Sequence, residues 1–255
     1  MNIISIIPAR MGSSRFPGKP MADILGMPMI GHVYKRVKMS KLLSEVYVAT
    51  CDTVIYDYIE SIGGKAVMTS DCHERCSDRC AEAMLKIEKN ENIKVDIMVM
   101  VQGDEPLTFP QMIDEAVSPM IKDKTMLIIN LVADLHTVKE FEDPNEVKVV
   151  MDKNNNALYF SREPIPSRKK GILEVPMKKQ VCVIPFTRDF LLQYNEMEPT
   201  PLEIIESVDM MRILENGMKV KMIDTEYETK AVDTSEDLQR VVKMMKDDVL
   251  FKSGY

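Results

Sequence analysis

Three cations and two glycines lie close together in the loop that follows the first apolar run of the sequence. The loop spans residues 8–20, and its cations are Arg10, Arg15 and Lys19. Arginine supplies a planar fork of donors and lysine a point charge, and both suit phosphate oxygens. Glycine lets the backbone approach an anion closely, and α/β sheets bind ligands where strands end. The pattern therefore predicts a polyphosphate site; the simpler alternative is a surface turn whose cations are solvated.

Two familiar phosphate-binding motifs do not fit this loop. Five residues separate Gly12 from Gly18, where the P-loop motif has four, and Pro20 stands where that motif carries a hydroxyl residue. The dinucleotide pattern G-x-G-x-x-G is absent as well. Any metal ion at the site must therefore be held by residues elsewhere in the chain.

Two aspartates are candidates for that metal site. Asp104 follows the apolar run that ends at Gln102-Gly103, and Asp233 lies between a predicted strand and a predicted helix. Carboxylates that face a phosphate site repel it unless a cation bridges them, and Mg²⁺ suits one or two carboxylates with phosphate oxygens and water. The alternatives are a strand-end turn at Asp104 and helix capping at Asp233.

Three cysteines spaced by four residues, with a histidine beside the first, invite a metal interpretation. They are Cys72, Cys76 and Cys80, and the histidine is His73. A spacing of four places the sulfurs on one helix face, but common zinc sites need a second pair of ligands from elsewhere, which this chain lacks. We expect structural thiols rather than a metal cluster.

Short apolar runs alternate with amphipathic stretches along most of the chain, which is typical of a largely parallel sheet covered by helices. Predicted strands cover residues 2–7, 45–50, 65–69, 97–102, 125–131, 147–152, 179–184 and 219–225. Predicted helices cover residues 29–39, 54–62, 77–89, 110–121, 188–196, 201–216 and 235–247. Residues 163–176 interrupt this rhythm with prolines and a basic run, which predicts an excursion over one face.

Length and charge narrow the functional classes. A chain of 255 residues can bury an ample core in one large α/β domain, and a net charge of -7 disfavours a general nucleic-acid surface. No apolar run reaches the roughly 18 residues that a membrane span requires, so we expect no membrane partner. Five cysteines, with no signal-type segment before the first strand, favour a reducing cytoplasm.

Taken in order, the motifs resemble those of the CMP-Kdo synthetase family, the 3-deoxy-manno-octulosonate cytidylyltransferases. The resemblance covers nearly the whole chain. It rests on Ile7–Arg10, Gly18–Pro20, Asp23-Ile24 with Gly26 and Pro28–Ile30, Val48–Thr50, Val101–Pro106, Asp143–Asn145 with Val147–Val150, Ala157–Arg162, Pro201–Glu203 with Glu206, and Val232–Thr234 with Glu236–Leu238.

The resemblance implies a Rossmann-like nucleotidyltransferase fold in a single domain of residues 1–255, with a capping or dimerisation excursion around residues 157–186. It implies Mg²⁺-dependent transfer of CMP from CTP to the anomeric hydroxyl of a 3-deoxy-2-keto sugar acid, Kdo or a Kdo-like acid. Pyrophosphate leaves, and the CMP-sugar serves lipopolysaccharide or capsule synthesis. Such in-line transfer needs positioning and charge neutralisation rather than a covalent intermediate. A cytoplasmic homodimer is expected.

The family pattern also assigns roles to individual residues. Those expected to bind the nucleotide are Pro8, Ala9, Arg10, Ser13, Arg15, Lys19 and Arg79. Those expected to face the sugar acid are Gln102, Arg162, Gln180 and Glu203. Asp104 and Asp233 are expected to bind Mg²⁺, and Arg10, Lys19 and Asp104 to be catalytic.

Two segments depart from the family pattern. Where the family carries His-x-Ser-Gly-Thr-(Asp/Glu)-Arg, this chain has residues 73–79, with Arg75-Cys76-Ser77 in place of Ser-Gly-Thr. Where the family carries a strand similar to His-Leu-Gly-Ile-Tyr-Gly-Tyr, this chain has residues 180–186, with Gln180 and Ile184 in place of His and the first Tyr. Cytosine selectivity is therefore inferred from the family alone, and a different acid acceptor is an alternative to Kdo.

Two further classes of protein remain as hypotheses. One is a nucleotide- or sugar-binding protein without catalysis, which would be indifferent to Asp104→Ala and to removal of Mg²⁺. The other is a cysteine-rich metal or redox protein, which would carry stoichiometric zinc or iron. The surviving phosphate loop and both carboxylates favour the active enzyme over either.

Overall fold

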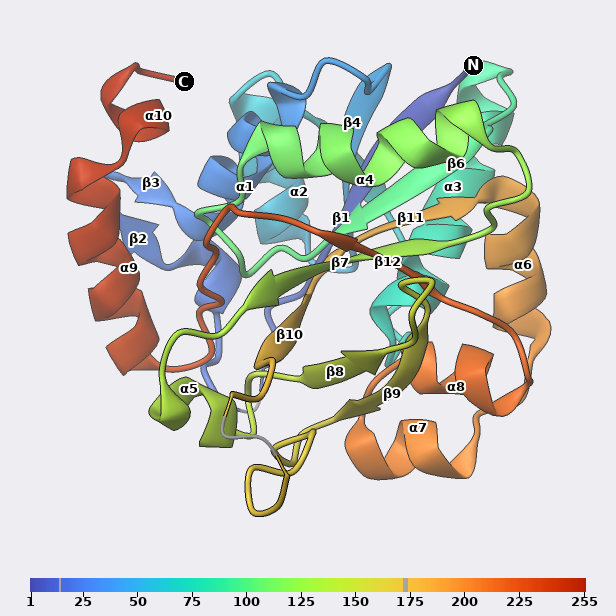
Figure 1. Ribbon diagram of the computed structural model, residues 1–255. Helices are drawn as coiled ribbons and strands as arrows, with labels where there is room; N and C mark the ends of the chain where they lie inside the picture. The colour runs from blue at the N-terminus through green and yellow to red at the C-terminus, as the bar shows by residue number, and fades with distance from the viewer. Residues whose placement is uncertain (14, 172–173) are drawn as a thin grey trace. The chain divides into compact units, whose positions relative to one another are not determined.

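The computed structural model describes residues 1–13, 15–171 and 174–255 (Figure 1). It separates into two compact units, one of Met1–Asp114 with Glu228–Tyr255 and one of Glu115–Tyr227. Ser14 of the predicted phosphate loop and residues 172–173 of the predicted excursion lie outside the described residues. The α/β class predicted from the sequence is confirmed, and the single-domain assignment stays a prediction.

The first unit is built on parallel strands in the order β6-β1-β4-β5. Its strands and helices are β1 (Ile3–Ala9), a 3₁₀ turn (Lys19–Met21), β2 (Asp23–Ile24), β3 (Met27–Pro28), α1 (Met29–Lys38), β4 (Glu45–Thr50), α2 (Thr53–Ser61), β5 (Lys65–Met68), α3 (Cys76–Glu91), β6 (Ile97–Val101), α9 (Ser235–Asp247) and α10 (Val249–Lys252). Every residue of β1 and β6 is buried, as expected for parallel strands covered on both faces.

The connections between these strands place the helices on both faces of the sheet. Right-handed crossovers put α1 and α2 on one face, because the chain moves outward from β1 to β4 to β5. The chain then returns from β5 to β6 through α3, which covers the opposite face. All four carboxyl ends therefore meet at one edge, where the sequence places the candidate site residues.

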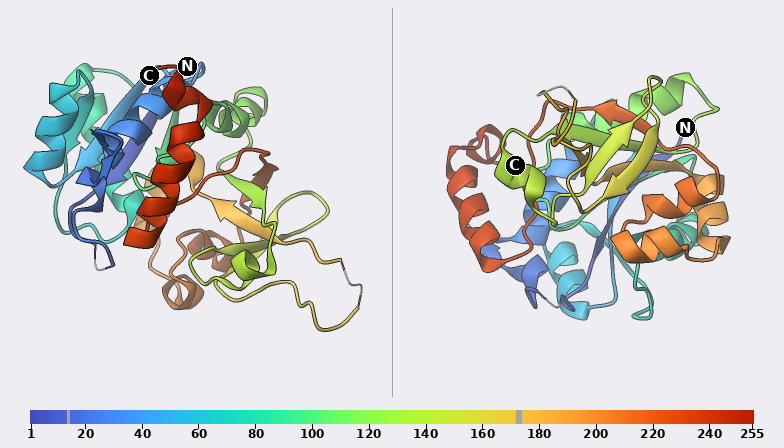
Figure 2. Two further views of the ribbon diagram at one scale, coloured as in Figure 1. Left: turned by 90° about the vertical axis from the view of Figure 1, so that its left-hand side faces the viewer. Right: turned by 60° about the horizontal axis from the view of Figure 1, so that its bottom comes forward.

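Helix α9 lies beside the β2–β3 hairpin, as Figure 1 and the left view of Figure 2 show. Its apolar face joins a buried cluster formed by Ile24, Met29, Leu107, Val232, Val241 and Met245. This packing fixes the start of α9 and, with it, the residues that precede the helix.

The second unit contains a mixed sheet in the order β12-β7-β10-β8-β9. Only the β12–β7 pair is parallel among the described pairs. Its elements are β7 (Ile129–Asp134), α5 (Val138–Glu142), β8 (Lys148–Met151), β9 (Ala157–Ser161), β10 (Lys178–Val181), β11 (Val183–Thr187), α6 (Arg188–Glu196), α7 (Pro201–Glu206), α8 (Met210–Glu215) and β12 (Lys221–Asp224). Helix α4 (Pro110–Lys122) contains the residue at which one unit gives way to the other.

Some predicted elements are wrong in their boundaries. The single helix predicted for residues 201–216 is two helices, because Ser207 adopts a left-handed backbone with φ 52° after α7. The single strand predicted for residues 179–184 is two strands separated at Cys182. Strand β7 begins four residues later than predicted, at Ile129 rather than Thr125.

Candidate active site

The cationic loop lines a cavity at the carboxyl edge of the parallel sheet in the first unit. The lining residues are Pro8, Ala9, Arg10, Gly12, Ser13, Arg15, Lys19, Pro20, Cys76, Gln102, Gly103 and Asp104. The structure thus brings the phosphate loop, which follows β1, to the residues that follow β6. Six of the seven residues expected to bind the nucleotide belong to this set.

The loop holds its shape through backbone contacts. The Met11 carbonyl accepts hydrogen bonds from the amides of Ser13 and Gly18, each at 3.0 Å. Gly18 has φ 76°, a left-handed conformation that glycine adopts without strain. Asp52, just after β4, accepts the Met11 amide at 2.8 Å and ties the loop to the neighbouring strand.

Gly103 lets the ends of β1 and β6 approach each other. A Cβ atom there would lie 3.0 Å from the Pro8 carbonyl oxygen and 3.2 Å from Ile30 Cδ1. Since those distances are too short for an ordinary contact, any larger residue would push β6 away from β1. The glycine therefore positions the adjacent Asp104 over the phosphate loop.

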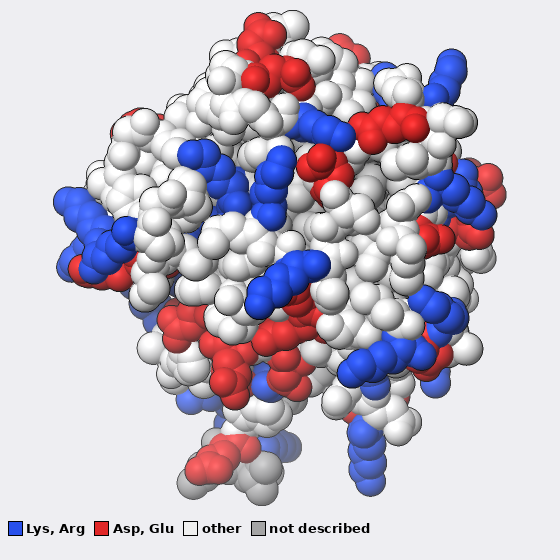
Figure 3. Space-filling view, turned by 90° about the horizontal axis from the view of Figure 1, so that it is seen from above, with Lys and Arg blue, Asp and Glu red and all other residues white. Residues whose placement is uncertain are grey.

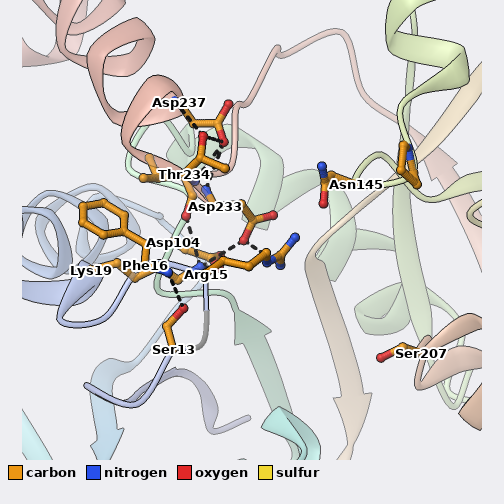
Figure 4. A network of polar contacts seen from close by, with 12 residues as sticks. Ser13, Arg15, Phe16, Lys19, Asp104, Asn145, Ser207, Asp233, Thr234 and Asp237 are labelled. Carbon is orange, nitrogen blue, oxygen red and sulfur yellow. Dashed lines mark hydrogen bonds and ion pairs between the residues drawn. The ribbon is translucent and has the colours of Figure 1, made fainter.

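The side chain of Lys19 joins the two candidate metal ligands (Figure 4). Lys19 Nζ lies 2.6 Å from Asp104 Oδ2 and 3.2 Å from Asp233 Oδ1, and donates to the Val232 carbonyl at 3.0 Å. Arg15 Nη2 contacts the same Asp233 oxygen at 2.9 Å. The prediction that these two aspartates lie together is thus supported by their shared contact with one ammonium group.

The ammonium group of Lys19 is charged at neutral pH. Burial lowers the pKa of Lys19, but attraction to Asp104 and then Asp233 outweighs it, so that the pKa is raised above its ordinary value. The side chains of Lys19, Asp104 and Asp233 are 15%, 19% and 17% exposed, so these charges interact with limited screening by water.

A capping box fixes Asp233 at the start of α9. Thr234 Oγ1 accepts the Asp237 amide, while Asp237 Oδ2 accepts the Thr234 amide at 3.0 Å. The Val232 amide also donates to the Asp104 carbonyl at 2.9 Å, which links the two candidate ligands through the backbone. Capping of α9 is thus carried out by Thr234 and Asp237, which leaves the Asp233 carboxylate to contact Lys19 and Arg15.

Arg79 lies outside the set of cavity-lining residues. Its side chain is buried in α3, where Nη1 donates to Thr69 Oγ1 at 2.6 Å and to the Ser70 carbonyl at 3.1 Å. These contacts fasten the segment after β5. Contact between Arg79 and the nucleotide stays a prediction, whereas Cys76, the first residue of α3, lines the cavity directly.

The cysteine interpretation needs one correction. Only Cys76 and Cys80 belong to α3; Cys72 precedes the helix, and its Sγ accepts from Ser70 Oγ, so the three sulfurs do not share a helix face. All five cysteines are present as thiols. Within residues 1–13, 15–171 and 174–255, no group of three or more His, Cys, Asp or Glu could hold a metal ion.

Glu82 in α3 holds the segment that precedes the helix, and this contact gives a test by pH. Burial acts to raise the pKa of Glu82, but hydrogen bonds from Lys86, the Ser70 amide and His73 outweigh it and lower the pKa to about 2. A lowered folded-state pKa stabilises the fold above the ordinary value of 4.5, and this stabilisation is lost as the pH falls toward 2.

We therefore expect Glu82→Gln to lower the free energy of unfolding at pH 7 by about 1 kcal/mol. The difference from the natural chain should shrink steadily between pH 4.5 and pH 2, because a protonated glutamate resembles glutamine. Urea unfolding at four pH values would measure it, with exposed Glu142→Gln as a control that changes little. A difference that is constant with pH would contradict this explanation.

The residues expected to face the sugar acid divide between the units. Gln102 lines the cavity in the first unit. In the second unit, Gln180 Nε2 donates to Asn130 Oδ1 at 2.6 Å, and the Arg162 guanidinium donates to the carbonyls of Glu206, Pro144 and Ser207.

Glu203 forms a buried ion pair with Arg212 in the second unit. Its side chain is fully buried, and its two carboxylate oxygens accept from Arg212 Nε and Nη2, each at 2.7 Å. Glu203 Oε2 also accepts the Thr200 amide and so caps α7. This carboxylate thus forms an ion pair within the second unit, and contact between Glu203 and the sugar acid stays a prediction.

Lysine and arginine side chains lie interspersed with aspartate and glutamate over the face seen in Figure 3. In the part of the chain that the structure describes, no helix is long and apolar enough to cross a membrane.

A parallel sheet whose carboxyl edge carries a cationic loop and paired carboxylates defines a nucleotide-binding α/β protein. Residues 4–220 match the family model described as Cytidylyltransferase. The chain belongs to this cytidylyltransferase family, and the resemblance to its CMP-Kdo synthetases is confirmed by the relatives.

The proteins similar to this chain include two that are named 3-deoxy-manno-octulosonate cytidylyltransferase. That of Geotalea uraniireducens (strain Rf4) is 43% identical over 96% of this chain and 100% of its own length. That of Geobacter metallireducens is 41% identical over 96% of this chain and 98% of its own length. A solved structure of CMP:2-keto-3-deoxy-manno-octonic acid synthetase complexed with CTP is 34% identical, with a TM-score of 0.88, and the match covers 97% of this chain and 99% of that one.

Asp52 and Gly103 are the site residues whose roles the sequence analysis missed. Each had a signal: Asp52 follows the apolar strand β4 at the same sheet edge, and Gly103 separates an apolar strand from two carboxylates. Their roles depend on distances between strands, which sequence patterns do not give.

Proposed function

We propose that this chain transfers CMP from CTP to the anomeric hydroxyl of Kdo or a closely related 3-deoxy-2-keto sugar acid, with release of pyrophosphate. The observation that carries the proposal is the meeting of the cationic loop with Asp104 and Asp233 at one point of the first unit. Full-length identity to enzymes named for this reaction supports it.

The loop residues bind the triphosphate in this proposal. Arg10, Arg15 and Lys19 come from one loop that lines the cavity, so their charges act on a single polyanion. Ser13, Pro8 and Ala9 line the same cavity and complete the nucleotide side. These fixed cations would hold the leaving pyrophosphate and stabilise the negative charge that develops on it as its bond to the α-phosphorus breaks.

The residues present fit a divalent cation. Asp104 and Asp233 supply oxygen ligands within reach of one positively charged atom, Lys19 Nζ, and Mg²⁺ needs one or two carboxylates when phosphates and water complete its shell. When bound, Mg²⁺ would neutralise phosphate charge and lower the pKa of the acceptor hydroxyl. Asp104 and Asp233 would hold it, while Gly103 and the Thr234 capping box keep both carboxylates in place.

Fewer contacts support the assignment of residues to the sugar acid. Gln102 follows β6 beside Asp104 and can donate to a hydroxyl or carboxylate of the sugar acid. Gln180 and Arg162 are assigned to the acceptor by the family pattern, with Gln180 oriented by Asn130. Because the relatives are named for Kdo, we propose Kdo as the acceptor despite the change from histidine to glutamine at residue 180.

We also propose a homodimer that acts in the cytoplasm. The family resemblance supports the dimer, and Leu158, Ile204 and Ile205 of the second unit, which are 60%, 61% and 73% exposed, would add apolar area to such a contact. A sedimentation experiment that finds only monomer at micromolar concentration would contradict this. The five thiols support a reducing compartment.

The acceptor is tested by a panel of 2-keto-3-deoxy sugar acids incubated with CTP and Mg²⁺. We expect pyrophosphate release with Kdo to exceed release with any other acid in kcat/KM, and CTP to exceed UTP. Release that is faster with a less hydroxylated or amino-substituted acid would move the assignment to that acid. No release with any acid would count against the proposed function.

A further inference from the structure

The position between the two candidate metal ligands is taken by a group of the protein itself, the ammonium group of Lys19. Lys19 Nζ contacts Asp104 at 2.6 Å and Asp233 at 3.2 Å, and its third contact is the Val232 carbonyl at 3.0 Å. Three donors of one ammonium group are thus matched by three oxygens that converge on it. Figure 4 shows the lysine chain directed at both carboxylates.

The two carboxylates that hold Lys19, those of Asp104 and Asp233, are also the ones that would bind a divalent cation. A cation that neutralises both carboxylates must lie close to both, and an ammonium group at that position blocks it by volume and by charge repulsion. The surroundings strengthen this exclusion, because Arg15 adds a second positive charge on Asp233 at 2.9 Å. Lys19 and Arg15 therefore both compete with a further cation for the oxygens of this pair.

The proposed exchange needs movement of the lysine side chain alone. Its backbone is fixed in the 3₁₀ turn after Gly18, but its four-carbon side chain is flexible. It lines the same cavity as Arg10 and Arg15, so a bound triphosphate offers its ammonium group a denser negative charge nearby.

We propose that Lys19 and a divalent cation are alternative occupants of the Asp104–Asp233 pair, and that triphosphate binding draws Lys19 away and opens the pair to the cation. This inference rests on the proposed function. It implies that the cation binds weakly to the nucleotide-free protein and that nucleotide and cation strengthen each other's binding by the same factor.

The test measures binding of Mn²⁺ alone, without nucleotide, from the electron paramagnetic resonance signal of free Mn²⁺. Lys19→Met removes the ammonium group and should tighten Mn²⁺ binding by about tenfold or more relative to the natural chain. Lys19→Arg keeps a cation and should bind Mn²⁺ as weakly as the natural chain. Lys19→Gln replaces the methionine variant if thermal unfolding shows that the latter does not fold.

A matched control is available in the second unit. Lys178 Nζ also joins two carboxylates, Asp134 at 2.9 Å and Asp224 at 2.5 Å, but those carboxylates are 59% and 55% exposed. Lys178→Met should leave Mn²⁺ binding unchanged, because the exposed pair is not assembled as a site. If Lys178→Met and Lys19→Met increased Mn²⁺ affinity equally, the inference would be overturned, because any two carboxylates released from a lysine would then bind Mn²⁺.

Three further outcomes decide the inference. Addition of Asp104→Asn to Lys19→Met should abolish the gain, and a gain that survives would place the Mn²⁺ elsewhere and overturn it. Mn²⁺ affinity of Lys19→Met within twofold of the natural chain also overturns it, while the proposed function stands if pyrophosphate release by the natural chain still requires Mg²⁺. Release that is indifferent to Mg²⁺ overturns the proposed function and this inference together.

Discussion

Replacement of Asp104 by asparagine is expected to lower kcat for pyrophosphate release by about 10³-fold. Asparagine has nearly the same shape, so the fold and the position of the loop should persist while the negative charge is lost. A metal ligand at a phosphoryl-transfer site contributes several kcal/mol, and about 4 kcal/mol corresponds to three powers of ten in rate. The initial rate with CTP, Mg²⁺ and Kdo, measured for the purified variant, gives the result.

The control for this prediction is Asp247→Asn. Its carboxylate is 92% exposed at the end of α9 and lies 3.4 Å from Nζ of the exposed Lys252, so the change should leave the rate unaltered. If Asp104→Asn retained turnover within threefold of the natural chain, Asp104 could not be a metal ligand. If neither the natural chain nor the variant released pyrophosphate while both bound CTP, the hypothesis of a binding protein without catalysis would replace the enzyme.

Replacement of Glu203 by alanine is expected to lower the free energy of unfolding by about 3 to 5 kcal/mol. The change leaves the Arg212 guanidinium buried without its carboxylate partner, since Glu203 is fully buried and contacts it twice at 2.7 Å. Burial lowers the pKa of Arg212, but the contact with Glu203 outweighs it and raises the pKa, so the arginine carries its charge. Urea unfolding followed by circular dichroism measures the loss.

A double variant separates a structural role from a substrate-binding role. Glu203→Leu with Arg212→Met removes both charges and should recover most of the stability, because apolar residues of similar volume often replace a buried ion pair at little cost. The recovered protein should show an unchanged KM for the sugar acid. A KM that rises tenfold in a stable double variant would place Glu203 in the acceptor site.

The order and type of the main elements could be predicted because capping residues, turn residues and apolar runs mark their positions in the sequence. Helix α9 begins where Thr234 caps it and ends where predicted, and β4, whose middle residues are apolar, has the expected bounds Glu45–Thr50. The break at Ser207 could not be predicted, because a left-handed serine has no sequence mark comparable to that of Gly217. Two-residue strands such as β2 are too short to show a period.

The phosphate side of the site could be predicted better than the acceptor side. Arg15 and Lys19 follow β1 and Asp104 follows β6, so parallel strands bring these three residues to one edge, which is a property of the fold class. Asp233 joins them from the start of α9. The position of Glu203 depends instead on the packing of α7 against α8. Its partner, Arg212, lies nine residues further on, and no periodicity indicates that this carboxylate is buried rather than directed at a ligand.

The most direct test of the central claim follows the phosphorus atoms of CTP during incubation of the natural chain with Mg²⁺ and Kdo. We expect ³¹P nuclear magnetic resonance to show loss of the CTP signals with appearance of a phosphodiester product and pyrophosphate in equal amounts, only when Kdo is present. Consumption of CTP to free CMP or CDP, or no consumption at all under these conditions, would contradict it.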